Sequence, residues 1–197
     1  MYIKNGFFVK NQWFYILPIG LFLLININAF FQPEVDFNVL IAQMGELPFF
    51  AMNVGLFLLF FWGLFFIVRF IHQQLIVKFT TGREKIDFGR IFFSFSLWWL
   101  FIVAQTALSY LFFPEDYQWN FQPAPFFTLL LISFLFIPFQ AGFEEYFFRG
   151  YFLQGTAILA RNRWIPLVLS SLFLGLVHIA NPEIAQMGYG FLVFYIS

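Results

Sequence analysis

An acidic doublet and a nearby arginine are the side chains best suited to chemistry in this 197-residue chain. Glu144 and Glu145 follow a long apolar run within the segment QAGFEEYFFRGYF, where aromatic residues surround them. Adjacent carboxylates in such surroundings repel one another and are poorly solvated. Arg149 lies four residues after Glu145, a spacing that places both on one helix face, whereas Glu144 points about 100° away.

This spacing gives the two carboxylates different roles. We expect Glu145 to form an ion pair with Arg149 and Glu144 to have no local partner, which would suit Glu144 to act as a general base. The alternative interpretation is an interfacial helix with an ordinary salt bridge and a second, solvated glutamate.

The chain has two histidines, and they occupy different surroundings. His178 lies at the end of an apolar run, SSLFLGLVHIANPE, with Ser171 seven residues earlier on the same helix face. A histidine within a long apolar helix is often a packing residue. A histidine within reach of a glutamate could instead help to hold and polarise a water molecule. His72 follows an apolar run beside Arg69, and we expect it to lie at the membrane interface.

The composition limits the class of protein. Hydrophobic residues make up 61% of the chain, aromatic residues 25% and charged residues 10%, and the mean hydropathy is +0.81. A soluble globule of this size could not cover so much apolar surface. Ten basic against ten acidic residues, with no basic run, argue against nucleic acid as a partner, and the absence of cysteine excludes disulfides and thiolate chemistry. We therefore predict an all-α, polytopic transmembrane bundle forming a single domain, residues 1–197.

The apolar runs predict five spans and the start of a sixth, given that a helical span needs about 20 residues. They are Trp13–Phe31, Phe49–Phe70, Ile91–Phe113, a run from near Pro125 to at least Gln140, Ile165–Ile179 and a segment from Met187 to Ser197.

The charges of the connecting segments alternate in sign. All ten Lys and Arg residues fall in the segments on one side of the predicted membrane. The charged residues of the loops 32–48 and 114–124, on the other side, are all acidic. The positive-inside rule makes the basic side cytoplasmic. We predict a multi-pass protein of the inner (plasma) membrane with a cytoplasmic N-terminus, and we interpret residues 71–90 as a cytoplasmic loop with an interfacial helix.

Two motifs resemble a known family. The segment from Glu144 to Arg149 matches the EExxxR motif of the CAAX prenyl protease and bacteriocin-processing (CPBP, or Abi) membrane proteins. About thirty residues later the family carries FxxxH, which Ser170–His178 resembles with Leu174 in place of the phenylalanine. The resemblance covers the core from about residue 125 to 197 and is incomplete at the C-terminus.

The resemblance implies a membrane-bound endopeptidase. Glu144 would be the base that activates a water molecule, His178 would assist it, and Glu145 and Arg149 would hold the helix in place. A third family motif, with a further histidine and an Asn or Asp, is not found before Ser197, so we expect a C-terminally truncated chain that cannot assemble a complete site. The alternative is a non-catalytic member that acts in bacteriocin self-immunity or as a scaffold.

A third possibility, a small transporter, is disfavoured because the first two spans offer only Asn26, Asn28 and Asn53 as polar groups. For the protease, a metal-free mechanism is preferred. Zinc is the rival, with Glu144 and His178 as ligands, as in a metalloprotease, although a catalytic zinc needs about three protein ligands. The expected partners are a peptide or membrane-protein substrate and the lipid bilayer.

The predicted spans place the two motifs at different depths. Glu144 would lie near the cytoplasmic end of the fourth span, whereas His178 would lie 13 residues, or about 20 Å, into a fifth span that starts at Ile165. Either the fourth helix bends at Pro138 or the fifth begins well outside the hydrocarbon. We predict that Glu144 and His178 nevertheless approach each other and face a polar cavity open to the cytoplasm.

Overall fold

The computed structural model describes residues 12–31, 37–160, 162 and 164–178. Every regular element in this part of the chain is helical, which confirms the all-α prediction. In chain order the elements are η2 (Gln12–Tyr15), α1 (Ile16–Phe31), α2 (Phe37–Met44), α3 (Glu46–Phe66), η3 (Ile67–Ile71), α4 (Ile76–Thr80), α5 (Phe88–Phe112), η4 (Pro114–Asp116), α6 (Pro123–Glu144), η5 (Glu145–Phe152), α7 (Leu153–Ala160) and α8 (Trp164–Val177).

Two of the long helices pass through π-helical turns. The helix α3 continues through η3 to Ile71, and α6 continues through η5 and α7 to Ala160, so that 38 residues form one rod. The rod begins at Pro123. Proline is favourable in the first turn of a helix, because a backbone N–H at this position would have no hydrogen-bond partner within the helix. At the start of α5, the Asp87 side chain accepts a hydrogen bond from the Arg90 backbone N–H.

Among the described residues, three helices are long and apolar enough to cross a membrane: Glu46–Ile71, Phe88–Phe112 and Pro123–Ala160. They correspond to the second, third and fourth predicted spans. The predicted first and fifth spans appear as shorter apolar helices, Trp13–Ile25 and Trp164–Val177. The predicted sixth span lies outside the described residues.

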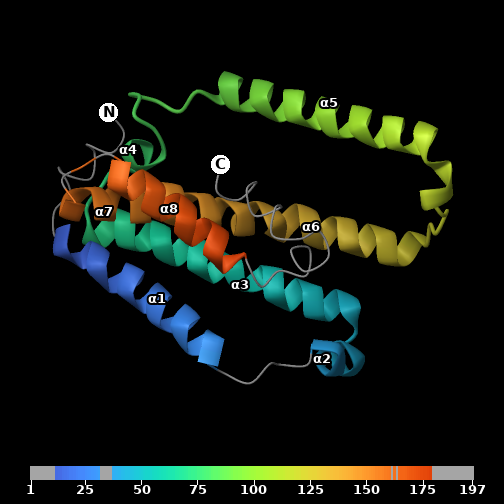
Figure 1. Ribbon diagram of the computed structural model, residues 1–197, viewed down its shortest axis with the longest axis horizontal. Coiled ribbons are helices and arrows are strands. Elements are labelled where there is room, and N and C mark those ends of the chain that lie inside the picture. Colours follow the sequence, from blue (N-terminus) through green and yellow to red (C-terminus); the bar gives the residue numbers. More distant parts are fainter. Residues whose placement is uncertain (1–11, 32–36, 161, 163, 179–197) are drawn as a thin grey trace.

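The rod packs along α3, and α8 folds back along η5 and α7 (Figure 1). The hydrophobic core lies at the end of the bundle where η2, η3, α4 and η5 meet, with members that include Tyr15, Val68, Phe79, Phe148 and Tyr151. The helix α5 runs apart from these elements in Figure 1, and none of its residues is buried within the described part of the chain.

Gly142 allows α3 to approach the rod closely. A Cβ atom at this position would lie 2.9 Å from Cε2 of Phe61, whereas a Cβ at Gly20 in α1 would meet nothing within 4 Å. The ring of Phe61 also packs against Phe139 with centroids 5.4 Å apart. The absence of a side chain at Gly142 therefore allows the close contact between Phe61 of α3 and the rod, two residues before Glu144.

We expect Gly142→Ala to destabilise the protein by about 1–3 kcal/mol, because the added methyl group displaces the Phe61 ring. The matched control, Gly20→Ala, makes the same change in open space and should be neutral or stabilising, since Ala favours helix over Gly. Thermal unfolding of the detergent-solubilised variants measures both. Equal melting temperatures for the two variants would show that the close contact contributes nothing.

Candidate active site

Glu144 and His178 meet at the junction of the rod and α8. Glu144 is the last residue of α6, and His178 directly follows α8. Oε2 of Glu144 lies 3.8 Å from Nε2 of His178, and the side chains are 26% and 15% exposed. The predicted approach of these two residues is therefore confirmed in the structure.

The conflict of depth disappears because the rod continues far beyond the apolar run. Ala160 lies sixteen residues after Glu144, and His178 lies fourteen residues after Trp164. The two arms of this helical hairpin thus have nearly the same length, about 24 and 21 Å at the rise of an α-helix. The sequence indicated Gln140 only as a lower bound for the fourth span and placed Glu144 near its end, because the EExxxR segment interrupts the hydropathy pattern without interrupting the helix. No bend at Pro138 is required, and α6 runs through this residue.

Glu144 has a local hydrogen-bond partner that the sequence prediction missed. The Gln140 side-chain amide donates to Oε1 of Glu144 at 3.5 Å, a long hydrogen bond across one helical turn. The expectation that Glu144 has no local partner was wrong. The i, i+4 spacing in the sequence could have indicated this contact. One carboxylate oxygen therefore faces Gln140 and the other faces His178.

The predicted pair of Glu145 and Arg149 is present. Nη1 of Arg149 donates to Oε1 of Glu145 at 3.3 Å, and the side chains of Arg149 and Glu145 are 46% and 59% exposed. Because exposed ion pairs contribute little to stability, this pair is a weak support for the helix. It lines a hollow of about 500 Å³ together with Thr80, Thr81, Gly82, Gly142, Tyr146 and Gly150.

His72 directly follows the apolar helix that ends at Ile71, and it is buried within the protein; its place at the membrane interface stays a prediction. Its side chain is fully buried, its Nε2 lies 2.9 Å from the hydroxyl of Tyr151, and its ring stacks on Tyr15. Phe79 of α4 is likewise fully buried. The first half of the predicted 71–90 loop therefore packs into the core, because its apolar and aromatic side chains meet partners more than 50 residues away in the sequence.

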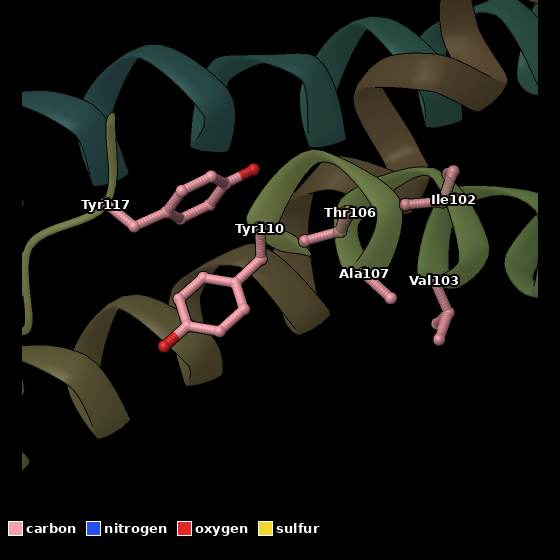
Figure 2. A pocket seen from close by; sticks show the side chains of 6 residues that line it. All are labelled: Ile102, Val103, Thr106, Ala107, Tyr110 and Tyr117. Atoms are coloured by element: carbon pink, nitrogen blue, oxygen red, sulfur yellow. The ribbon is translucent and has the colours of Figure 1, made fainter. Parts of the chain in front are cut away.

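Two other hollows are largely apolar. One of about 400 Å³ lies between α1, α3 and the rod, and Phe143 and Phe147 on either side of Glu144 in the sequence contribute to its wall. The other, of about 470 Å³, lies on α5 and is shown in Figure 2. Its lining contains no carboxylate or imidazole, and consists of Ile102, Val103, Thr106, Ala107, Tyr110 and Tyr117. A polar cavity at Glu144 and His178 stays a prediction.

The described residues do not supply a full zinc site. Glu144 and His178 are chemically suitable ligands, but no group of three or more His, Asp or Glu side chains comes together in the described ranges. A catalytic zinc site takes about three protein ligands. The donor set seen in this part of the chain does not fit the metal, and the zinc alternative stays a prediction.

The C-terminal part of the chain matches a protease family. Residues 123–197 match the family model described as "Type II CAAX prenyl endopeptidase Rce1-like". The match begins at the first residue of α6 and includes both motif segments, so the resemblance stated from the sequence is confirmed. The fold indicates a polytopic helical membrane protein, and this match shows that its C-terminal part is similar to the CAAX-type membrane proteases.

A relative of unknown function matches most of the chain. The chain is 28% identical over 183 residues to "Uncharacterized protein YyaK" of Bacillus subtilis (strain 168), and the alignment covers 92% of the chain. The alignment covers 59% of the relative, so the chain spans about three fifths of that protein. No solved structure matches the chain.

Proposed function

We propose that this protein is an intramembrane endopeptidase in which Glu144 activates a water molecule for attack on a peptide bond and His178 assists it. The observation that carries the proposal is the 3.8 Å separation of Glu144 Oε2 and His178 Nε2 within the segment that matches the family. Glu145 and Arg149 support the helix from its neighbouring face.

The geometry suits a shared water molecule. A separation of 3.8 Å is too long for a direct hydrogen bond, and polar groups at such distances are commonly bridged by water. A water molecule held by both groups could lose its proton to the carboxylate while the imidazole orients it. The Gln140 amide holds the other carboxylate oxygen and so restricts the rotation of the Glu144 side chain. The tetrahedral intermediate also needs a hydrogen-bond donor for its oxyanion, and an imidazole N–H can be that donor.

The surroundings favour an apolar substrate. The hollow formed by α1, α3 and the rod is lined almost entirely by apolar side chains, and it borders the segment that carries Glu144. Such a surface fits the side chains of a hydrophobic peptide or of a membrane-protein segment. We further propose, from the distribution of Lys and Arg, that the site lies toward the cytoplasmic side of a plasma membrane and that the N-terminus is cytoplasmic.

A cleavage assay in isotopic water tests the proposal. The purified protein in detergent is mixed with a set of hydrophobic peptides in water enriched in oxygen-18, under single-turnover conditions, and the products are weighed by mass spectrometry. We expect cleavage products whose new carboxylate carries one heavy oxygen, because the nucleophile is water. No cleavage of any peptide, or a new carboxylate without the label in the first turnover, would contradict the mechanism.

A further inference from the structure

A second polar cluster is buried on the same rod, beyond Glu144. It consists of five side chains that are between 0 and 6% exposed, and we call it the Tyr151 cluster: Tyr15, His72, Gln74, Tyr151 and Gln154. Its members come from η2, from the turn after η3, and from η5 and α7. It therefore ties two separate segments of the chain, η2 and the turn after η3, to the helix that carries the candidate catalytic glutamate.

Hydrogen bonds connect the members of the cluster. Nε2 of His72 lies 2.9 Å from the Tyr151 hydroxyl, which also donates to the backbone carbonyl of Phe14 at 3.3 Å. Because a tyrosine hydroxyl carries one proton, the Tyr151 hydroxyl accepts from the imidazole N–H when it donates to this carbonyl. The Gln154 carbonyl oxygen accepts from Gln74 at 3.1 Å and from the Tyr15 hydroxyl at 3.3 Å.

The backbone between Glu144 and Tyr151 departs from the α-helix. Residues seven apart share a face of an α-helix. The intervening segment, Glu145–Phe152, is π-helical, and a π-helical turn holds an extra residue, which rotates the following part of the helix by about 100°. As a result Glu144 meets His178 after α8, whereas Tyr151 meets His72 and η2.

The partner segment is irregular at the same point. The π-helical η3 ends at Ile71, directly before His72, and Gln73 has a φ of 53°. A positive φ in a residue other than glycine is uncommon and persists where its surroundings hold it. Thus the two π-helical segments η3 and η5 and the strained backbone of Gln73 all lie next to the His72–Tyr151 hydrogen bond.

The composition of the cluster argues for a geometric role rather than for stability alone. The amide oxygen of Gln74 and the amide nitrogen of Gln154 are buried without a hydrogen-bond partner among the residues that the structure describes. A partly satisfied polar network is less stable than apolar side chains of the same shape. What such a network can supply is a fixed relative orientation of the segments that it joins.

We propose that the His72–Tyr151 hydrogen bond is a positioning device, which holds the π-helical turn and thereby sets the rotation at which Glu144 faces His178. His72 and Tyr151 are then positioning residues and not catalytic ones. The catalytic consequence rests on the proposed function, whereas the geometric part of the inference does not.

The geometric part is tested by measuring a distance. Because the chain has no cysteine, spin labels can be attached only at introduced cysteines, here at the exposed positions Ala141 on α6 and Leu176 on α8. We expect Tyr151→Phe and His72→Phe to shift or broaden the distance distribution measured by pulsed electron paramagnetic resonance. His72→Gln, whose amide can still donate to Tyr151, should restore the parent distribution at least in part.

The control is Tyr110→Phe, which removes the same hydroxyl from an exposed tyrosine of α5 and should leave the distance unchanged. An unaltered distribution in Tyr151→Phe and His72→Phe would overturn the inference. Failure of both variants to give folded protein, judged by circular dichroism and gel filtration, would overturn it as well, because the cluster would then be needed for folding itself.

The catalytic part is tested on the same variants with the peptide that the wild type cleaves. We expect kcat to fall about 10- to 100-fold in Tyr151→Phe with KM changed less than about twofold, since a misplaced catalytic group slows the chemical step. A shifted distance with unchanged kcat would overturn this part. If the wild type cleaves nothing, the proposed function fails, and the distance measurement still decides the geometric part.

Discussion

Glu144→Gln is expected to lower kcat about 10²- to 10⁴-fold, because general-base catalysis contributes a factor of this size. The amide has the shape of the carboxylate and can still accept a hydrogen bond from Gln140, but it cannot take a proton from water. KM should change little, since the substitution removes no apolar contact. Steady-state kinetics in detergent or in nanodiscs, with the peptide that the wild type cleaves, measures both constants.

The matched control is Glu84→Gln, which removes an exposed carboxylate from the turn before α5. This variant should keep the wild-type kcat and KM. If Glu144→Gln also stayed within about threefold of the wild type, Glu144 would not be the base, since even the lower end of a general-base contribution is about 10². If the folded wild type were as inactive as Glu144→Gln, the result would favour the non-catalytic interpretation of the family resemblance.

His178→Ala is expected to lower kcat about 10- to 10³-fold, and the loss should be smaller than for Glu144→Gln. The imidazole orients the water molecule and donates to the oxyanion, whereas proton abstraction itself belongs to the carboxylate. His178→Gln should recover part of the activity if a neutral hydrogen-bonding group is sufficient. The measurement is again kcat against KM, with circular dichroism to show that the helices remain.

A larger loss in His178→Ala than in Glu144→Gln would reverse the two roles and make the imidazole the base. An increase in KM with an unchanged kcat would instead place His178 in substrate binding. Either result would leave the 3.8 Å contact in place and change its interpretation.

Several features of the fold could be predicted from the sequence because they depend on local chemistry. The low content of charge and the long apolar runs indicated helical spans, and the second, third and fourth predicted spans agree with long apolar helices in the structure. The i, i+4 spacing predicted the ion pair of Glu145 and Arg149. The approach of Glu144 and His178 followed from the pair of motifs rather than from hydropathy.

Other features depend on contacts that no local pattern reveals. The rod continues to Ala160 although its hydropathy falls after Gln140, because polar side chains on a helix can pair with one another or find partners in the bundle. His72 is buried because Tyr15 and Tyr151, 57 and 79 residues away in the sequence, enclose it. A histidine beside a loop gives no sign of such partners, and its position after an apolar run and beside Arg69 indicated only the membrane interface.

The same limit applies to the spans at either end. The first and fifth predicted spans form helices shorter than the three long ones, and the segment from Met187 lies outside the described residues. The expected truncation before the third family motif and the zinc alternative accordingly stay predictions. The candidate site as described consists of one carboxylate, one imidazole and the amide of Gln140.

A double-mutant cycle on kcat tests most directly whether Glu144 and His178 act on the same water molecule. The two single variants and the double variant Glu144→Gln/His178→Ala are compared with the wild type under identical conditions. Groups that work as a unit are not additive, so we expect the double variant to be no slower than Glu144→Gln alone, within about threefold. A double variant slowed by the product of the two single effects would contradict the account, because the two residues would then act independently.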